Sequence, residues 1–582
     1  MRARGERRLR AALHRRAPDP HRHRADRLRR RRAPRADQRR RGRHRRPALP
    51  AGRHGEHGQH HGRRRPGRCR APGRRRGAHR RGHPRRGPRP DASDDQLRDH
   101  LRDHRAGAAE LRLVSEAIEL ARRALPGAEA WVVGGAVRDR LLGRDTEDID
   151  LAVAGDPAGA ARALARATEP RAASFALSDA FGAWRVVGPG HAWQIDLTPL
   201  RGGSLEADLR LRDFTINAMA EPLAGGDLVD PAGGAADLAA RRLRAVSDAA
   251  FTDDPLRTLR LPRLACELDL EAEPGTLALA RAAAGGLARV APERIFGELK
   301  RVVGSPRPRA GLELAGDLGL LDHVLPELSA LRGVEQNRYH HADVLGHTYE
   351  VLDETVALER DPGGVLGDEH AEALAALLAE PLADELSRGT ALRFGALLHD
   401  AAKPQTRATT PDGETLGFPG HDVQGADLSR AALRRLRASE RLQSHVAALA
   451  RHHLALGFLV HRAPLSRRDV YRYLLATEPV EVDVSLLSVA DRLATRGHKA
   501  DEAIARHLEV ARAIVGDALR WRAAGGAPRP LVRGDELARE LDLTRGPELG
   551  RVLAELQEAQ FAGEVRDRQE ALAVARSLLA RS

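Results

Sequence analysis

Residues 131–150, WVVGGAVRDRLLGRDTEDID, decide the fold and contain the first chemical site of the chain. The stretch opens as an apolar strand and ends where a second apolar strand begins with Asp148 and Asp150, one residue apart. Side chains i and i+2 of a strand project from the same face, so both carboxylates are expected to converge on one site. Two convergent carboxylates suit a pair of divalent cations that hold a triphosphate.

Between the two strands, Gly134 and Gly135 precede a short helix that carries Arg138. Glycines allow backbone N–H groups and a helix N-terminus to approach phosphate oxygens closely. Asp196, in QIDL on a later strand, is expected to complete the metal site as a third carboxylate. This layout predicts nucleotidyl transfer, in which a 3′-hydroxyl attacks an α-phosphate in line and pyrophosphate leaves.

Charge is distributed unevenly along the 582 residues, a length that predicts three or four folded units. Residues 1–90 hold 35 of the 97 Lys and Arg but 5 of the 81 Asp and Glu, a net +30 that leaves −14 for the rest. This segment has little apolar periodicity, so residues 1–95 are expected to form no core. It is either an RNA-binding arm or sequence upstream of the genuine start; its lack of Lys favours the second interpretation.

Cysteine usage and hydropathy suggest the compartment. Cys69 and Cys266 are the only cysteines, and one of them lies in the Arg-rich segment, so a disulfide framework is not expected. No apolar run approaches the roughly 20 residues that span a bilayer, and the N-terminus lacks an apolar signal stretch. We therefore expect a cytoplasmic protein with no membrane partner.

Hydrophobic periodicity divides the remainder into an α/β part and a helical part. The α/β part is expected to contain helices at 108–124, 136–142, 157–167 and 213–220 and strands at 130–133, 148–153, 182–188 and 192–197. From about residue 235 the pattern is almost wholly helical. The expected units after the Arg-rich segment are an α/β region at 108–232, a helical region at 233–330, a His-rich helical domain at 335–520 and a helical tail at 530–582.

Downstream of the strands, DDPLRTLR places Asp254, Arg257 and Arg260 three residues apart. Such spacing predicts that the three side chains share one helix face. A carboxylate and a guanidinium can present acceptors and donors to the edge of a nucleobase, so a base-reading platform is one interpretation. A surface helix stabilised by ion pairs is the other.

Six motifs occur in a fixed order over roughly 170 residues: GGAVRD, DID, LRDFTINAMA, DPxGG (residues 230–234), DDPLRTLR and PERIFGEL. Together they resemble the class II tRNA nucleotidyltransferase and bacterial poly(A) polymerase family. The resemblance implies an α+β fold, with a polymerase-β-like nucleotidyltransferase head followed by an all-α neck and body, a helical HD domain and a helical tail. It also implies Mg²⁺ as cofactor and addition of CMP and AMP from CTP and ATP to the 3′ end of tRNA or another RNA, without a nucleic-acid template.

The same resemblance assigns roles to particular residues. Asp148 and Asp150 hold metal, and Asp196 is the third catalytic carboxylate. The incoming nucleotide is contacted by Gly134, Gly135, Arg138 and Arg212. Its base pairs with Asp254 and Arg257, and its phosphates are contacted by Arg260 and Arg263. Glu293 and Arg294 brace the neck helix.

Three departures from the family pattern bear on specificity. Leu211 replaces an Arg that commonly accompanies the one at position 212, and Pro262 lies inside a helix that it is expected to kink. The stretch between Asp196 and Arg212 is short, whereas many family members have a longer flexible loop here that helps the site switch from CMP to AMP. Addition of CC only, of A only, or of poly(A) therefore stays open beside complete CCA addition.

The domain at 335–520 contains many of the histidines outside the Arg-rich segment, including the adjacent pair His399 and Asp400. Neutral imidazole with carboxylate suits Mn²⁺, Ni²⁺, Fe²⁺ or Mg²⁺ better than structural zinc. The pattern is similar to the HD phosphohydrolase superfamily. That resemblance implies His347, His399, Asp400 and Asp491 as core ligands, with His421 and His452 (or His453) as candidates for a second metal.

Other functions remain possible from the sequence. The HD domain is either a metal-dependent phosphodiesterase or phosphatase, or a degenerate domain that docks RNA. A hydrolase with a vestigial head and a non-catalytic RNA-binding protein are further alternatives. The intact D-x-D argues against a vestigial head, because clustered carboxylates are costly and readily lost. The sequence leaves the oligomeric state open.

Overall fold

The computed structural model describes residues 110–144, 146, 148–178, 182–336, 340–412, 414–497 and 500–580. The Arg-rich segment 1–95, Cys69 and the start of the expected helix 108–124 lie outside these residues. The first described helix is α3 (Glu110–Ala124), which presents Ala117 and Ala121 to the core. Within these ranges, no helix is both long and apolar enough to cross a membrane.

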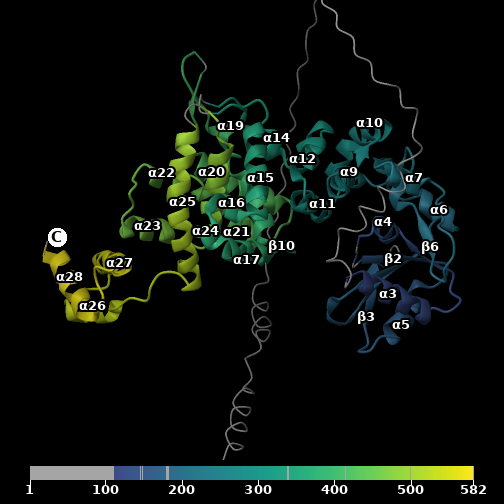
Figure 1. Ribbon diagram of the computed structural model, residues 1–582, viewed down its shortest axis with the longest axis horizontal. Helices are drawn as coiled ribbons and strands as arrows, with labels where there is room; N and C mark the ends of the chain where they lie inside the picture. The colour runs from purple at the N-terminus through teal and green to yellow at the C-terminus, as the bar shows by residue number, and fades with distance from the viewer. Residues whose placement is uncertain are drawn as a thin grey trace, which may run out of the picture. The chain divides into compact units, whose positions relative to one another are not determined.

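A six-stranded mixed sheet forms the α+β part of the chain (Figure 1). Its strands, in the order β3-β4-β5-β2-β1-β6, are β1 (Ala130–Val133), β2 (Asp148–Val153), β3 (Ala173–Ser178), β4 (Ala183–Val187), β5 (Gln194–Pro199) and β6 (Ala220–Pro222). Strands β2 and β5 are parallel, and every other pair in this sheet is antiparallel. Helices α4 (Gly135–Leu141), α5 (Pro157–Arg166) and α6 (Leu205–Arg210) connect the strands.

The expected helix at 213–220 is wrong. Residues Thr215–Asn217 form a single 3-10 turn (η2), and strand β6 follows and pairs with β1. The Asp213 carboxylate accepts hydrogen bonds from the backbone N–H of Phe214 and from the Asn217 side chain, an alternative to continued helix. Strand β3 and helix α6 were not expected from the sequence, because neither shows a clear period on its own.

Helices dominate after the sheet (Figure 1). They are α7 (Gly234–Ala239), α8 (Ala250–Asp253), α9 (Arg257–Leu268), α10 (Pro274–Ala283), α11 (Pro292–Gly304), α12 (Pro308–Asp317), α13 (Leu321–Val324) and α14 (Pro326–Ser329). A short parallel pair, β7 (Arg242–Leu243) and β8 (Glu271–Ala272), and the 3-10 turns η1 (Pro189–His191) and η3 (Ala284–Arg289) complete this part. One hydrophobic cluster extends from the sheet through these helices, so the sheet and helices share a core.

The His-rich part consists of packed helices with a second apolar core. Its main helices are α15 (Val344–Arg360), α18 (Arg388–Leu398), α20 (His421–Arg435), α21 (Glu440–His452), α22 (Ala455–Val460), α23 (Arg467–Thr477), α24 (Glu481–Ala494) and α25 (Ala500–Ala523). Shorter elements are α16 (Pro362–Leu366), η4 (Asp368–His370), α17 (Ala371–Ala379), α19 (Lys403–Thr406) and the hairpins β9 (Pro381–Ala383) with β10 (Leu386–Ser387) and β11 (Ala408–Thr409) with β12 (Thr415–Gly417).

The last three helices have an apolar cluster of their own. They are α26 (Gly534–Glu540), α27 (Pro547–Phe561) and α28 (Arg568–Ala580), the yellow end of the ribbon in Figure 1. Their contact with α23 combines ion pairs with aromatic packing: Arg468 lies 2.7 Å from Glu564 and 3.1 Å from Glu555, and the Phe561 ring packs 5.4 Å from Tyr471. The exposed ion pairs contribute little to this contact, so the Phe561 ring carries most of its packing.

Candidate active and metal sites

Strand pairing brings the three predicted carboxylates onto neighbouring strands. Asp148 and Asp150 are exposed while Ile149 between them is buried, as strand alternation requires. Asp150 stands directly opposite Asp196 in the parallel pair β2–β5. All three carboxylates therefore lie on one face of the sheet, an oxygen-only donor set of the kind that Mg²⁺ prefers.

The Asp196 carboxylate already has a partner that the sequence analysis did not include. Arg185 on β4 donates two hydrogen bonds of 2.7 Å to its two oxygens, and this pairing raises the pKa of Arg185. Each oxygen keeps a second lone pair, so the fork does not exclude metal ligation. In the sequence, the only sign of this partner is that Arg185 interrupts the apolar residues of AWRVV.

Gly134 brings the glycine turn, Arg212 and the metal site together. Its φ of +72° and ψ of −132° define a conformation that side chains rarely adopt. A Cβ at this position would lie 2.9 Å from a terminal nitrogen of Arg212 and 3.3 Å from Oδ2 of Asp150. The backbone of the turn therefore approaches both groups as closely as a glycine permits.

The electrostatics of Asp150 favour a cation. Although the side chain faces solvent, the protein around it desolvates the carboxylate and raises its pKa to about 6. Arg212 opposes this shift, and the charges of Asp196 and Asp148 add to it. A divalent cation among these carboxylates would relieve their mutual repulsion, so the residues present fit such an ion.

A chain of polar contacts links the glycine turn to the helices that follow the sheet. Arg138, only 8% exposed, is bound by Asp139 and donates a 2.7 Å hydrogen bond to Asn217. Asn217 donates to Asp213, whose other oxygen lies 2.8 Å from Arg260 on α9. Arg138 and Arg260 are therefore held in place by protein groups, and their predicted nucleotide contacts stay predictions.

The structure places Arg263 differently from the other predicted contacts. Its side chain is 4% exposed and lies 2.8 Å from Glu298 and 3.9 Å from Glu267. Burial lowers the pKa of Arg263, and the Glu298 charge opposes that shift. A guanidinium enclosed in this way anchors α9 to α11, and its predicted contact with an incoming phosphate stays a prediction.

The expected shared helix face of Asp254, Arg257 and Arg260 is wrong. Asp254 follows the end of α8 in extended backbone, because the next residue, Pro255, disfavours helical geometry there. Its carboxylate lies 2.8 Å from Arg294 on α11. Arg257 begins α9, which continues through Pro262, and donates to the backbone carbonyls of residues 211, 212 and 250.

The second site lies in the His-rich part, where buried His and Asp side chains from several helices meet. Two overlapping groups have ligand atoms within 4.8 Å of one another: His347, His399 and Asp400, and Asp400, His421 and His453. Asp491 joins the first group through an oxygen 2.9 Å from Nε2 of His347. Lys403 also lies 2.6 Å from Asp400.

The imidazoles of His399, His421 and His453 share one arrangement. In each, Nδ1 lies 2.6–2.8 Å from the carbonyl oxygen three residues earlier, so Nδ1 donates and Nε2 carries a lone pair. Nε2 of His399 is buried without a hydrogen bond, 3.1 Å from Asp400 Oδ2. The Nε2 atoms of His421 and His453 are 3.2 Å apart. Lone pairs that converge in this way fit a divalent metal ion.

Of the two alternatives at 452 and 453, the geometry brings His453 into the cluster. His453 is 1% exposed, whereas His452 is half-buried and outside both groups. Successive residues at a helix end point about 100° apart, so only one of them can face the cluster. Burial and the neighbouring His399 lower the pKa of His453 to about 4. Burial raises the pKa of Asp400, but His399 and Lys403 hold it well below its usual range.

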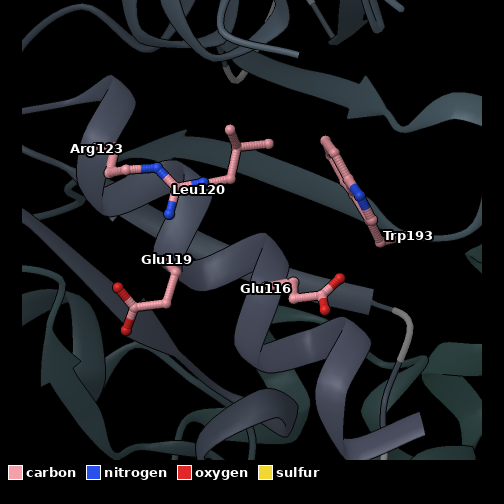
Figure 2. Close-up of a pocket in the computed structure, with 5 residues that line it drawn as sticks. All are labelled: Glu116, Glu119, Leu120, Arg123 and Trp193. Carbon is pink, nitrogen blue, oxygen red and sulfur yellow. The ribbon is translucent and has the colours of Figure 1, made fainter. Parts of the chain in front are cut away.

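Among the described residues, two of the hollows are large enough to hold a small molecule. One, of about 580 Å³, borders the His/Asp cluster at His453 and Asp491. Figure 2 shows the other, of about 420 Å³, where Trp193 faces the helix α3 across from Leu120 and Arg123. No predicted site residue lines this second hollow.

Three family models match the chain in the order of its parts. Residues 130–182 and 190–244 match the Poly A polymerase head domain, residues 269–331 the probable RNA and SrmB-binding site of polymerase A, and residues 344–496 the HD domain. An A-adding tRNA nucleotidyltransferase of Deinococcus radiodurans is 38% identical over 455 residues, which cover 77% of this chain and 94% of that protein. The chain belongs to the class II tRNA nucleotidyltransferase family.

This tRNA 3′-end nucleotidyltransferase has further similar proteins. A CC-adding tRNA nucleotidyltransferase of Thermus thermophilus is 35% identical and covers 76% of this chain and 92% of that protein. Two solved structures are also similar: a CCA-adding enzyme with ATP (TM-score 0.53) and the Thermotoga maritima CCA-adding enzyme with tRNA (TM-score 0.52). Each is 20% identical, and each match covers 83% of this chain and 98% of the solved chain. These structures support the expected fold, a mixed α+β head followed by helical regions that include an HD domain.

Proposed function

We propose that this tRNA nucleotidyltransferase transfers AMP or CMP at the face formed by Asp148, Asp150 and Asp196. The observation that carries the proposal is the close approach of Asp150 and Arg212 to the Gly134 turn. Mg²⁺ held by the carboxylates would lower the pKa of the tRNA 3′-hydroxyl and neutralise the leaving pyrophosphate. We expect Arg212 to bind the triphosphate, and the backbone N–H groups of the glycine turn to contact its oxygens.

We further infer that the enzyme adds one kind of nucleotide rather than the complete CCA sequence. The stretch between Asp196 and Arg212 contains strand β5 and helix α6 in place of a flexible loop. Asp208 in α6, 2% exposed, binds both Arg201 and Arg212, which holds this segment against the site. The inference is consistent with the two similar proteins, one A-adding and one CC-adding, because this chain matches each of them over more than nine tenths of its length.

In the test, the full chain is incubated with Mg²⁺ and with one of three tRNAs, which end before CCA, after C or after CC. Each receives labelled CTP or ATP alone, and a gel reads product length. Addition of only A to the CC-ended tRNA, or of only C to the shorter ones, supports the inference. Stepwise addition of C, C and A would refute it, and long A ladders on any RNA would reassign the chain as a poly(A) polymerase. The double variant Asp148→Ala, Asp150→Ala should bind tRNA yet incorporate nothing.

We propose, secondly, that the HD domain is a metal-dependent phosphohydrolase. The supporting observation is the set of Nε2 lone pairs that converge on Asp400. His347, His399, Asp400 and Asp491 would hold one ion such as Mn²⁺, Ni²⁺ or Fe²⁺, and His421 and His453 with Asp400 a second. Such ions would activate a water for attack on a phosphate ester.

The test is hydrolysis of 2′,3′-cyclic AMP and p-nitrophenyl phosphate with each metal. We expect His399→Ala with Asp400→Ala to remove hydrolysis and leave nucleotide transfer intact. A wild-type protein without hydrolysis under any metal would refute the second proposal and favour RNA docking. Loss of transfer in the variant would show instead that the two parts depend on each other structurally.

A further inference from the structure

The sheet face that carries the three carboxylates is packed on one side of them and open on the other. Over β1 and β2, helix α6 presents Leu205 and Leu209. These side chains form one apolar cluster with Val133 and Ala152. Val187 of β4 lies on the same face beyond the carboxylates, is half-buried and belongs to none of the apolar clusters of the described residues. The carboxylates therefore stand at the border between a covered half and an open half of the face.

Strand register places Phe175 on this open half. Phe175 of β3 stands opposite Arg185 of β4, and Arg185 stands opposite Asp196 of β5. Directly opposite residues of neighbouring strands project to the same side, so the Phe175 ring and the Asp196 carboxylate share one face. The other face is packed, since Arg162 of α5 lies over the ring of Trp184 at 5.6 Å. With strands about 4.8 Å apart, the backbones of Phe175 and Asp196 are about 10 Å apart, a distance that the terminal nucleotides of an RNA can span.

The exposure of Phe175 is unusual for its position in the sheet. Strand β3 forms an edge of the sheet, and its side chains Phe175 and Leu177 are 45% and 43% exposed. Edge strands with exposed apolar side chains favour aggregation, and proteins usually protect them with charged residues. The sequence of β3, ASFALS, contains no charged residue. An exposed aromatic ring beside a site for nucleic acid is typical of a platform on which a base stacks.

The geometry of the reaction points to the same half of the face. The triphosphate is proposed to bind at the Gly134 turn, which follows β1, so the leaving pyrophosphate faces that strand. In-line displacement requires the attacking 3′-hydroxyl to arrive from the opposite side, over β5 and β4. Arg185 lies there: its Nε and Nη2 donate to Asp196, whereas Nη1 makes no hydrogen bond within the described residues. A phosphate of the RNA backbone can accept a hydrogen bond from Nη1.

We propose that the last base of the acceptor RNA stacks on Phe175 and that this contact positions the 3′-hydroxyl at the three carboxylates. The inference rests on the proposed transfer site and adds a positioning residue on its acceptor side. A second copy of this chain is the other occupant that an apolar edge strand could take. An RNA end is favoured because the ring shares its face with Arg185 and the proposed metal ions, which attract an anionic chain.

The experiment is a double-mutant cycle between the side chain and the base. Wild type and Phe175→Ala extend, in single turnovers with Mg²⁺, the tRNA that the wild type accepts and the same tRNA with an abasic last nucleotide. We expect Phe175→Ala to extend the normal tRNA about tenfold more slowly. The wild type should extend the abasic tRNA about tenfold more slowly than the normal one. Both proteins should extend the abasic tRNA at nearly the same rate, because no stack is left to lose.

Two further variants and a binding measurement separate stacking from a structural role. Phe175→Trp keeps an aromatic face and should extend the normal tRNA within about threefold of wild type. Phe458→Ala removes a 66% exposed ring on α22, is the matched control and should change the rate less than about twofold. Melting temperatures of both Ala variants should stay within about 2 °C of wild type. The same cycle, measured as tRNA dissociation constants without CTP or ATP, reports the stack in the absence of any chemistry.

Equal losses of Phe175→Ala on the normal and the abasic tRNA, or no loss on either, would overturn the inference and leave the proposed transfer standing. Coupling in the dissociation constants, with no incorporation by the wild type, would do the reverse. Absence of both incorporation and coupling would remove both proposals. A molecular mass that falls from dimer to monomer in Phe175→Ala, without coupling, would assign the edge strand to a second copy of this chain and overturn the inference.

Discussion

Glu298 offers the sharpest test of the polar chain that joins the head to the following helices. Its carboxylate lies 2.8 Å from Arg263 and 3.3 Å from Arg260, and its side chain is 11% exposed. Glu298→Ala leaves Arg263, 4% exposed, with only Glu267 at 3.9 Å. Removing one partner of a buried ion pair costs about 3–5 kcal/mol of stability. Because Glu267 remains near Arg263, we expect a loss at the lower end, about 3 kcal/mol.

The assay is hydrogen exchange of the full chain, read separately on α9, α11 and the helices α26–α28. A local loss of ~3 kcal/mol should accelerate exchange in α9 and α11 by roughly 100-fold and leave α26–α28 unchanged. Glu293→Ala, on the same helix but 63% exposed and 3.9 Å from its nearest partner, is the matched control and should change exchange less than about threefold.

A double variant separates lost charge from lost packing. Glu298→Leu with Arg263→Met removes both charges, and it should restore exchange to within about tenfold of wild type. Acceleration below about fivefold in Glu298→Ala, or a double variant no better than the single one, would refute the reasoning that this buried pair holds α9 against α11.

Three further predictions concern the glycine turn, the metal site and the tail. Gly134→Ala should lower the free energy of unfolding by about 1–3 kcal/mol, while Gly135→Ala, whose Cβ meets Arg138 at an ordinary 3.4 Å, should cost much less; equal melting temperatures would contradict this. Because the Asp150 pKa is raised to about 6, protons compete with Mg²⁺ as pH falls, so half-saturating Mg²⁺ should rise about fivefold from pH 6 to 5; saturating Mg²⁺ is the control, and a pH-independent value argues against the assignment. Arg468→Ala should accelerate exchange of α26–α28 about fivefold, and no change there would show that other contacts hold the tail.

Much of the candidate site was predictable because it depends on short-range geometry. Alternation along DIDLAV predicts that Asp148 and Asp150 share a face, and the double glycine predicts a close backbone approach; the strand register and the φ of Gly134 agree with both. The helix at 213–220 failed for a local reason as well, because the Asp213 side chain competes with the helical hydrogen bonds.

Other features depend on contacts between distant segments. Nothing in DDPLRTLR states that Asp254 meets Arg294 forty residues later, or that Arg263 is enclosed by Glu298. The choice between His452 and His453 depends on how α21 is rotated in its packing, which neighbouring helices determine. Arg185 likewise becomes part of the site only because strand pairing places it opposite Asp196.

The sequence by itself therefore determined the family and the order of the parts, and it predicted which residues carry chemistry, because motifs and periodicity are properties of adjacent residues. Only the tertiary structure decided which of those residues face one another. Arg138, Arg260 and Arg263 look alike in the sequence, yet protein carboxylates enclose Arg263 while Arg260 stays 39% exposed. Burial of a charge depends on the whole packed core, and that packing decides whether an arginine anchors a helix or remains open to a ligand.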